Sequence, residues 1–416
     1  MTVKEKTRLI VFDVEGILIP RNMFFFQIGR AIGFSALIQI MLYRLLYEVG
    51  VFSLDSSIKR IFKKLKGQKM EMLQSIFDQI PDTLRLQNFF VQIKKEGNYR
   101  IVLISSGLPT VIVERFANCL GADYAHGINV CVNASEKITG EVSGEVIEIK
   151  GRRKILQQIL SKESLALCDC TIVARDRSNR CIYTVETKKI GYNPNFIIRM
   201  KSDYVVMGKL ANVLPILSDK KNKWSFPSIN DFVRENIHAA GIFMPIIAQI
   251  IGDVRPVAIF ISALSIIYLI SEIARLNGKN LPLISKITRY AASQSELYGF
   301  AAAPLFYAAG ILFTLLFFPF PASAAAIAIF TLGDSIASIF GGSLGIRLPF
   351  NKGKTLEGSL SGFAFAFLAG SLFVAPWIAA IGAAIAMFVE CLPVPINDNV
   401  LIPITTATAV ALMLLI

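Results

Sequence analysis

The sequence predicts two domains of different classes: an α/β domain with an open parallel sheet and a helical cap, and then an all-α polytopic membrane domain of about seven transmembrane helices. Charge separates them, because the first 232 residues hold 34 Lys and Arg and 22 Asp and Glu, whereas the last 184 hold only 9 and 8. Apolar strand-like segments lie in the first part, and long apolar stretches lie in the second. We therefore expect domains at 1–216 and 233–416, joined by a polar linker at 217–232.

Three strand-like segments of the first domain end in polar residues. RLIVFDVEG leads into Asp13 and Glu15, YRIVLISSG leads into Ser105 and Ser106, and CTIVARD leads into Asp176. Buried parallel strands that alternate with helices form an open sheet, and such sheets bind ligands beyond the carboxyl ends of their strands. We therefore expect these polar strand ends to converge on one site.

The insert at about 20–95, between the first two strands, has a helical pattern and is expected to form a cap. Its run FFFQIGRAIGFSALIQIMLYRLLYEVGVF is unusually apolar, but Arg30, Arg44 and Glu48 interrupt it. A cap core is favoured over a hairpin that spans the membrane, and contact with the lipid interface stays open as an alternative.

The second domain contains seven apolar stretches that approach the length of membrane spans, which is about 20 residues for about 30 Å of hydrocarbon. Short connections between them alternate with long polar ones, and the long ones carry most of the Lys and Arg residues. Positive charge favours the cytoplasm, so the long loops and the first domain are placed there. The stretches are roughly 238–252, 256–274, 297–317, 321–340, 358–374, 376–392 and 399–416.

The net charge of +13 lies almost entirely in the first domain. No base-reading motif accompanies it, so nucleic acid is not an expected partner. Anionic lipid headgroups attract such a surface by about 1 kcal/mol per well-placed cation. A basic domain that lies against the membrane is therefore the favoured interpretation.

Polar residues interrupt the apolar pattern in GDSIASIFGGSLGIRLPFNKGKTLEG, residues 333–358. Asp334 precedes the last turns of an expected span, where a carboxylate is costly unless it is paired, hydrated or bound to a cation, so we expect a functional site. Glycines permit close backbone approach and cations bind phosphate. The alternative is a positively charged cytoplasmic loop with a helix-capping Glu. The candidate phosphate-binding residues are Gly333, Gly341, Gly342, Arg347, Lys352, Lys354 and Glu357.

GDSIASIFGGSLGI followed by GKTLEGSLSG resembles the dolichol kinase and phytol kinase (polyprenol kinase) family. Further matching segments are VRENIHAAG, YLISEIARL and the pattern DN-x-x-x-P at 398–403, so the resemblance covers about 234–416. It implies an integral membrane enzyme that uses CTP to phosphorylate a long isoprenoid alcohol.

The same resemblance implies individual roles. Asp334 and Asp398 are candidate Mg²⁺ ligands, because Mg²⁺ binds one or two carboxylates together with nucleotide phosphates. Lys352 and Lys354 are expected to hold those phosphates. His238 is expected to orient the alcohol or act as its base, with a structural role as the alternative. The family often has an acidic pair where this chain has only Asp398 preceded by an Asn.

The strand ends of the first domain resemble the motifs of the haloacid dehalogenase (HAD) superfamily, especially its phosphoserine-phosphatase-like members, over about residues 7–205. The resemblance implies a Rossmann-like sheet, a nucleophile at Asp13, and an acid–base at Glu15, which is one methylene longer than the usual Asp. It also implies Mg²⁺ held by Asp13 and Asp176, and a phosphate-binding hydroxyl at Ser105 or Ser106.

Two features of this HAD resemblance leave alternatives open. The phosphate-binding cation is Lys150, Arg152 or Lys154, which all fit by position. Arg180 stands where the fourth motif usually has a second acid, which removes negative charge from the Mg²⁺ site. The domain is then either a weakened or altered phosphatase, or a degenerate domain that binds a phosphorylated ligand without turnover.

The leading hypothesis is a membrane lipid kinase that transfers the γ-phosphate of CTP to an isoprenoid alcohol and carries a HAD phosphatase-like domain. One alternative is a CTP-dependent cytidylyltransferase that makes a CDP-lipid. Another is a membrane scaffold or receptor whose first domain senses a phosphorylated ligand. The expected partners are CTP, the alcohol and the lipid bilayer, and the expected cofactor is Mg²⁺.

Overall fold

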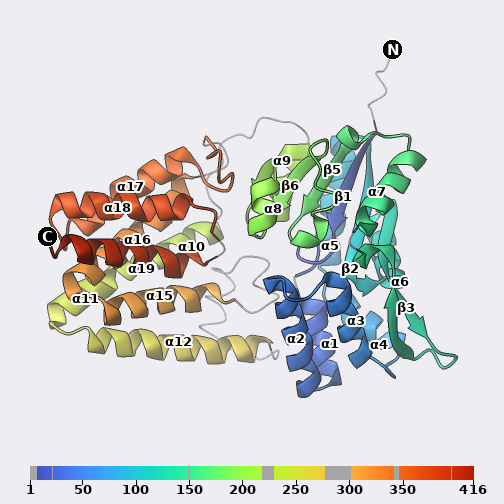
Figure 1. Ribbon diagram of the computed structural model, residues 1–416, viewed down its shortest axis with the longest axis horizontal. Helices are drawn as coiled ribbons and strands as arrows, with labels where there is room; N and C mark the ends of the chain where they lie inside the picture. The colour runs from blue at the N-terminus through green and yellow to red at the C-terminus, as the bar shows by residue number, and fades with distance from the viewer. Residues whose placement is uncertain are drawn as a thin grey trace, which may run out of the picture. The chain divides into compact units, whose positions relative to one another are not determined.

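The computed structural model describes residues 7–20, 22–148, 150–217, 229–276, 301–341, 346–394 and 396–416 (Figure 1). The chain divides into two compact units, Met1–Lys220 and Lys221–Ile416. The first unit is built on a β-sheet, and the regular elements of the second are all helices among its described residues. We describe each unit by itself.

The sheet of the first unit has the strand order β4-β3-β2-β1-β5-β6-β7. All neighbouring strands are parallel except β3 and β4. The bounds are β1 (Arg8–Asp13), β2 (Tyr99–Pro109), β3 (Tyr124–Val132), β4 (Ile138–Ser143), β5 (Cys170–Ala174), β6 (Lys188–Tyr192) and β7 (Tyr204–Val206). This is the open Rossmann-like sheet that the sequence predicts.

The central strand β1 explains the position of the polar strand ends. Its residues 9–12 are all apolar and at most 1% exposed, because helices cover both faces of the sheet. Asp13 pairs in register with Ile104 of β2, and Phe12 pairs with Val173 of β5. The residues that follow these positions therefore emerge together at the carboxyl edge of the sheet.

The helices of the first unit form a cap and a layer on the sheet. Figure 1 shows the cap helices grouped beyond the carboxyl end of β1. They are α1 (Met23–Ile32), α2 (Phe34–Val49), α3 (Leu54–Lys64) and α4 (Met70–Asp78). The sheet layer contains α5 (Thr83–Glu96), α6 (Thr110–Leu120), α7 (Gly151–Lys162), α8 (Phe196–Lys201) and α9 (Leu214–Leu217).

The expected cap boundary at residue 95 needs a correction. Phe89 and Phe90 of α5 stack against Phe12 of β1, with ring centroids 5.9 and 5.5 Å apart. The helix α5 therefore belongs to the core of the sheet, and the cap ends before it. The helical pattern of 20–95 is correct, but periodicity alone does not distinguish a cap helix from a helix that covers the sheet.

In the second unit, α16 lies at the centre and contacts α10, α15, α17, α18 and α19. The helices are α10 (Ile229–Ala239), α11 (Phe243–Ile251), α12 (Arg255–Leu276), α15 (Ala303–Phe317), α16 (Phe320–Phe340), α17 (Leu356–Gly370), α18 (Pro376–Cys391) and α19 (Asp398–Met413). A Cβ atom at Gly362 would lie 2.8 Å from the carbonyl oxygen of Gly333. Glycine at this crossing thus lets α16 and α17 pack closely, as in membrane helix pairs.

Two helices of the described part of the chain are long and apolar enough to cross a membrane: Arg255–Arg275 and Phe320–Phe340. The other apolar helices of the second unit are shorter, such as Ala303–Phe317 and Pro376–Cys391. The structure thus shows a helical unit with two candidate membrane spans, and the expected number of about seven is not confirmed. Helices of 15 or 16 residues are shorter than a full span.

Candidate functional sites

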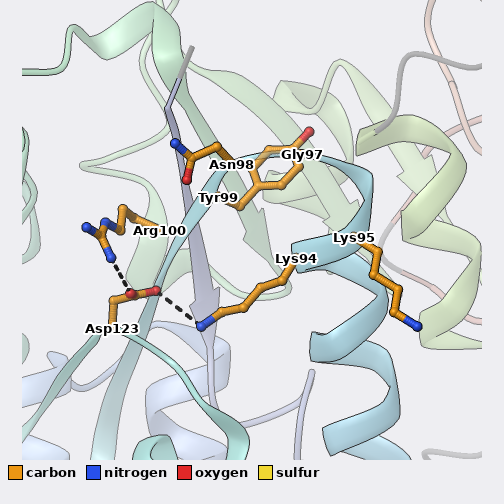
Figure 2. A pocket seen from close by; sticks show the side chains of 7 residues that line it. All are labelled: Lys94, Lys95, Gly97, Asn98, Tyr99, Arg100 and Asp123. Atoms are coloured by element: carbon orange, nitrogen blue, oxygen red, sulfur yellow. Dashed lines mark hydrogen bonds and ion pairs between the residues drawn. The ribbon is translucent and has the colours of Figure 1, made fainter. Parts of the chain in front are cut away.

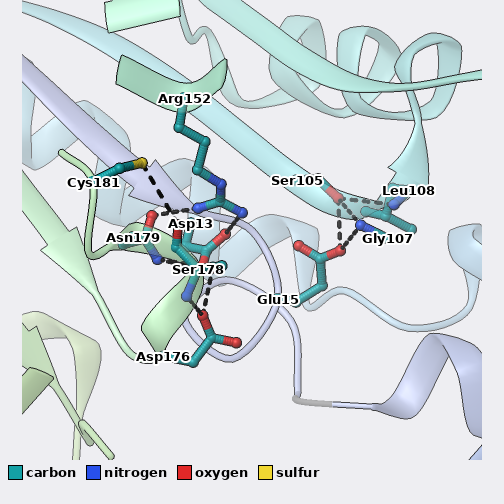
Figure 3. A network of polar contacts seen from close by, with 10 residues as sticks. All are labelled: Asp13, Glu15, Ser105, Gly107, Leu108, Arg152, Asp176, Ser178, Asn179 and Cys181. Carbon is teal, nitrogen blue, oxygen red and sulfur yellow. Dashed lines mark hydrogen bonds and ion pairs between the residues drawn. The ribbon is translucent and has the colours of Figure 1, made fainter. Parts of the chain in front are cut away.

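The polar strand ends of the first unit meet at one edge of the sheet (Figure 3). Asp13 ends β1, Ser105 lies on β2, and Asp176 follows β5. Figure 3 shows Asp13 and Asp176 in one part of this site and Ser105 beside Glu15 in the other. The structure therefore brings together the residues that the three sequence motifs contribute.

Asp13 is held by a buried polar network. Asn179 Nδ2 donates to Asp13 Oδ2 over 2.7 Å, and Arg152 Nη2 lies 3.3 Å from Asp13 Oδ1. Arg152 also donates from Nη1 to the side-chain oxygen of Asn179. Asp13 is 3% exposed and Arg152 is 1% exposed, so the ion pair is shielded from water. The network fixes both oxygens of the candidate nucleophile.

Burial raises the pKa of Asp13 to about 7. The positive charge of Arg152 opposes this rise, and the negative charges of Asp176 and Glu15 add to it. The carboxyl groups of Asp13, Asp176 and Glu15 are therefore close enough to influence one another. Carboxylate oxygens of this kind are the ligands that Mg²⁺ prefers, and Mg²⁺ needs only one or two of them beside a substrate phosphate. Asp13 and Asp176 thus fit a Mg²⁺ site by type.

No group of three or more His, Cys, Asp or Glu side chains suited to a metal ion occurs among the residues that the structure describes. This applies to both units. The Mg²⁺ sites expected at Asp13 with Asp176, and at Asp334 with Asp398, are therefore sites with two carboxylates. A bound phosphate would have to complete either of them.

Glu15 makes two short contacts on the opposite side of the site from Arg152 (Figure 3). Its Oε1 atom accepts from Ser105 Oγ over 2.7 Å and from the Gly107 N–H over 2.6 Å. Its Oε2 atom is buried and has no hydrogen-bond partner in the described structure. A hydroxyl and a backbone N–H that point at one oxygen form an anion-binding pair, and here a carboxylate of the chain itself uses it.

Arg152 is the cation of the site, and Lys150 and Lys154 are not. Lys150 is exposed at the start of α7. Lys154 is 63% exposed and pairs with Glu145, with 2.5 Å between nitrogen and oxygen. The expectation that one of these two lysines binds phosphate is therefore wrong by position, whereas the third candidate, Arg152, lies at the nucleophile.

Asn179 is the site residue that the sequence reasoning missed. The fourth motif drew attention to Arg180, but Arg180 is exposed and Asn179 is 2% exposed and contacts Asp13. The available signal was the spacing Asp-x-x-Asn after a buried strand. Asp176 opens this turn by accepting from the N–H of Ser178 over 3.0 Å. Of the two candidate serines, Ser105 is the one that contacts Glu15. Ser106 lies next to it and is 9% exposed.

Tyr47 of the cap helix α2 lies close to Asp176 and Arg152 of this site. Burial raises the pKa of Tyr47 to about 12, and the negative charge of Asp176 adds to the rise. The Tyr47 hydroxyl has no hydrogen-bond partner in the described structure. Arg177 lies over the Tyr47 ring at 4.3 Å and donates to the backbone oxygens of Tyr47 and Phe52. The loop after β5 therefore binds the cap directly.

Another hollow of about 450 Å³ lies near the start of β2, at the edge of the sheet opposite the site (Figure 2). Two of its cations are paired: Arg100 lies 2.9 Å from Asp123, and Lys94 donates to the Gly121 oxygen over 2.5 Å. Ligands of parallel sheets bind at the carboxyl edge. We therefore assign this hollow no role in catalysis.

The second unit gathers polar side chains around His238 of α10. Its Nδ1 lies 3.2 Å from Ser335 Oγ, and its Nε2 lies 3.3 Å from Asn399 Oδ1 and 3.8 Å from Asp334 Oδ2. The His238 ring also packs against Tyr307, with centroids 4.2 Å apart. The structure thus brings the two candidate residues His238 and Asp334 together and adds Ser335 and Asn399 as partners.

Lys354 lies among carboxylates. It pairs with Glu390, which is 1% exposed. Burial lowers the pKa of Lys354, but the charges of Glu390, Asp334 and Asp398 outweigh this effect and hold it above its ordinary value. Asp334 and Asp398 therefore act on the same ammonium group, and the loop that carries Lys354 lies at the same end of the bundle as His238.

Other residues of the predicted phosphate loop serve the packing of the helices. The Glu357 carboxylate accepts from the Ile346 N–H at 2.8 and 3.1 Å, and Thr355, not Glu357, caps α17. Gly333 lies in the contact of α16 with α17, and Gly341 accepts from the Thr355 hydroxyl over 3.0 Å.

The other cations of this loop are at least partly accessible to solvent. Arg347 is exposed, and its backbone forms an isolated antiparallel β-bridge with Thr355. Lys352 is half-buried. Gly342 lies outside the described residues.

Comparison with known proteins agrees with the two sets of motifs. No family model matches the chain. The N-terminal half is similar to phosphoserine phosphatase of Archaeoglobus fulgidus, with 22% identity over 226 residues, which cover 53% of this chain and 64% of that protein. The C-terminal region is similar to probable phytol kinase 1, chloroplastic, of Oryza sativa subsp. japonica, with 31% identity over 151 residues, which cover 32% of this chain and 47% of that protein.

Among solved structures, a phospho-aspartyl intermediate analogue of phosphoserine phosphatase aligns with a TM-score of 0.43 and 22% identity, over 49% of this chain and 94% of that one. The chain spans less than two thirds of the length of either curated relative. The sequence comparisons confirm the predicted resemblances: HAD phosphatase homologues match the first half, and phytol kinase homologues match the C-terminal region.

Proposed function

We propose that the second unit is an integral membrane kinase that transfers the γ-phosphate of CTP to an isoprenoid alcohol. The observation that carries this proposal is the convergence of His238, Asp334 and Asn399 from α10, α16 and α19 at one end of a helical bundle. Its similarity to a protein named a phytol kinase supports an alcohol of the prenol type. Dolichol, polyprenol and phytol all belong to this class.

Phosphoryl transfer needs an oriented hydroxyl, an acceptor for its proton and neutralisation of phosphate charge. His238 has a fixed orientation, because Ser335, Asn399 and the Tyr307 ring all contact it. The alcohol oxygen would bond to the γ-phosphorus while the bond to CDP breaks, and its proton would pass to His238 or Asp334. Bound Mg²⁺, held by Asp334 and Asp398, would supply charge neutralisation.

The nucleotide would enter from the side of the 346–355 loop. Lys354 is available to phosphate only in part, because Glu390 already binds it. Lys352 and Arg347 are the other cations of this loop, and we assign them to the nucleotide phosphates. In this proposal the loop faces the cytoplasm and about seven helices cross the bilayer, some of them shorter than a full span.

We infer for the first unit a phosphatase of low turnover. Asp13 would attack the phosphorus of a phosphate ester while the ester bond breaks and Glu15 gives its proton to the leaving oxygen. Water would then hydrolyse the aspartyl phosphate. Arg152 and Asn179 hold the nucleophile, and Ser105 is the hydroxyl that would contact phosphate. The alternative is that this domain binds a phosphorylated ligand without turnover.

The test of the kinase uses the purified full chain with Mg²⁺, a panel of prenols, and CTP labelled at either the α- or the γ-phosphate. A kinase moves only the γ-label to the lipid. Transfer of the α-label with release of pyrophosphate identifies a cytidylyltransferase instead. If no prenol is labelled by either form of labelled CTP or by labelled ATP, the result contradicts a kinase function.

A further inference from the structure

The cap helix α2 presents a row of apolar side chains to solvent. Phe34, Ile38, Leu42 and Leu45 are 77, 52, 47 and 55% exposed. Their spacing of three or four residues places them on one face of the helix. Single exposed apolar residues are ordinary, but a continuous row of large ones marks a surface that binds a partner.

The opposite face of α2 is firmly packed, so the row is a fixed feature of the fold. Ile40 is fully buried, and Tyr47 is 3% exposed. Arg44 is 5% exposed, donates to the Asn22 side chain over 2.8 Å, and lies over the Phe25 ring at 5.0 Å. The exposed row cannot turn inward without removing these residues from the core.

The neighbouring helix α3 is basic on its exposed side. It is joined to α2 by a hydrogen bond from Ser57 Oγ to the Tyr43 oxygen over 3.0 Å. The ring of Phe52 packs on Tyr43 at 6.3 Å, and Arg60 lies over Phe52 at 4.8 Å, which brings Arg60 of α3 next to α2. The exposed cations of α3 and the turn after it are Lys59, Arg60, Lys63, Lys64 and Lys66.

We propose that α2 and α3 form a membrane-docking face, with the apolar row inserted at the surface of an anionic lipid bilayer and the cations of α3 at its headgroups. An apolar face bordered by Lys and Arg is the pattern of helices that lie in the membrane interface. Anionic headgroups complement the cations. The proposal does not depend on the activity of either unit.

Charge favours lipid over a protein occupant. The last 184 residues of the chain hold only 8 acidic residues, so the second unit offers few counter-charges for α3. A second copy of the first unit would bring a further excess of positive charge. The chain also carries two candidate membrane spans, which would hold the first unit close to a bilayer and raise its local concentration there.

The test places a single Trp on the docking face of the full chain in vesicles. With Trp224→Phe and Trp377→Phe as background, Leu42→Trp is compared with Leu84→Trp, because Leu84 is 77% exposed on α5 and belongs to neither α2 nor α3. In vesicles of phosphatidylcholine and phosphatidylserine with brominated acyl chains, we expect about threefold stronger quenching at position 42 than at 84, as insertion at the interface requires. Equal quenching at the two positions would overturn the proposal.

A charge reversal tests the role of α3. The double change Lys63→Glu with Lys64→Glu should reduce the quenching of Trp at position 42 in anionic vesicles at least about twofold, and high salt should do the same. Lys95→Glu on α5 is the control and should have no such effect. If position 42 is shielded from acrylamide but not quenched by brominated lipid, a protein surface covers α2 and the lipid proposal is wrong.

Discussion

Shortening Glu15 by one methylene should open the phosphate-binding pair of the first unit. In the structure, Glu15 Oε1 accepts from both Ser105 Oγ and the Gly107 N–H, at 2.7 and 2.6 Å. In the proposed phosphatase, a phosphate oxygen would use the same two donors, so Glu15 would compete with the substrate. In Glu15→Asp the carboxylate no longer reaches them, and phosphate binds without displacing it.

The size of the effect follows from the two hydrogen bonds. A hydrogen bond to a charged group contributes about 1.5–3 kcal/mol, so the competition amounts to at least about 3 kcal/mol. At about 1.4 kcal/mol per factor of ten, this lower figure corresponds to about 100-fold, and we expect phosphate to bind Glu15→Asp about 100-fold more tightly than the wild-type chain. Binding of inorganic phosphate or vanadate, measured by calorimetry on the full chain, gives this ratio directly.

A matched variant separates competition from other effects. Glu15→Gln keeps the length of the side chain but removes its charge, so it should give a smaller gain than Glu15→Asp. Thermal unfolding should show that both variants are folded. If Glu15→Asp binds phosphate no more tightly than the wild-type chain, the carboxylate does not compete for the donors and the reasoning is wrong.

Three further predictions concern named residues. Asp334→Asn should abolish transfer of phosphate to prenol with little change in the unfolding temperature, because it removes a charge at nearly constant volume; wild-type turnover with normal Mg²⁺ dependence would contradict this. Lys354→Ala should destabilise the chain by about 3–5 kcal/mol, because it leaves Glu390 buried without its partner, whereas the double change with Glu390→Gln should recover much of that loss in thermal unfolding. Asp13→Asn should eliminate labelling of the first unit by ³²P-acetyl phosphate; equal labelling of Asp13→Asn and wild type would place the nucleophile elsewhere.

The strands and their polar ends could be predicted because both depend on local sequence. A buried strand needs a short apolar run, and the residues that follow it must lie at the carboxyl edge of a parallel sheet. Arg152 could have been chosen over Lys150 and Lys154 in the same way. It shares the helical spacing of Ile155, Leu156 and Ile159, which form the buried face of α7, and the two lysines do not.

Other features depend on contacts between distant segments. His238 meets Asn399 across 161 positions of sequence, and no local pattern indicates that contact. Gly333 belongs to a motif that suggests phosphate binding, yet its missing side chain serves the crossing of α16 and α17. Small residues suit both purposes, so sequence alone does not separate them. Helix ends within the bundle likewise differ from the apolar stretches in both directions: α17 ends at Gly370, short of the predicted 374, whereas α12 extends beyond the predicted 256–274 to Arg255–Leu276.

The turn after β5 has a consequence for the cap. Two of its residues, Asp176 and Asn179, lie near Asp13. Between them, Arg177 contacts the Tyr47 ring at the end of α2 and donates to the Phe52 oxygen. Moving α2 away must break the Arg177 contacts and release the strand end that positions the other two. An opening of the cap would therefore be linked to misalignment of Asp13, and a ligand that favoured the closed cap would stabilise the aligned site by the same free energy.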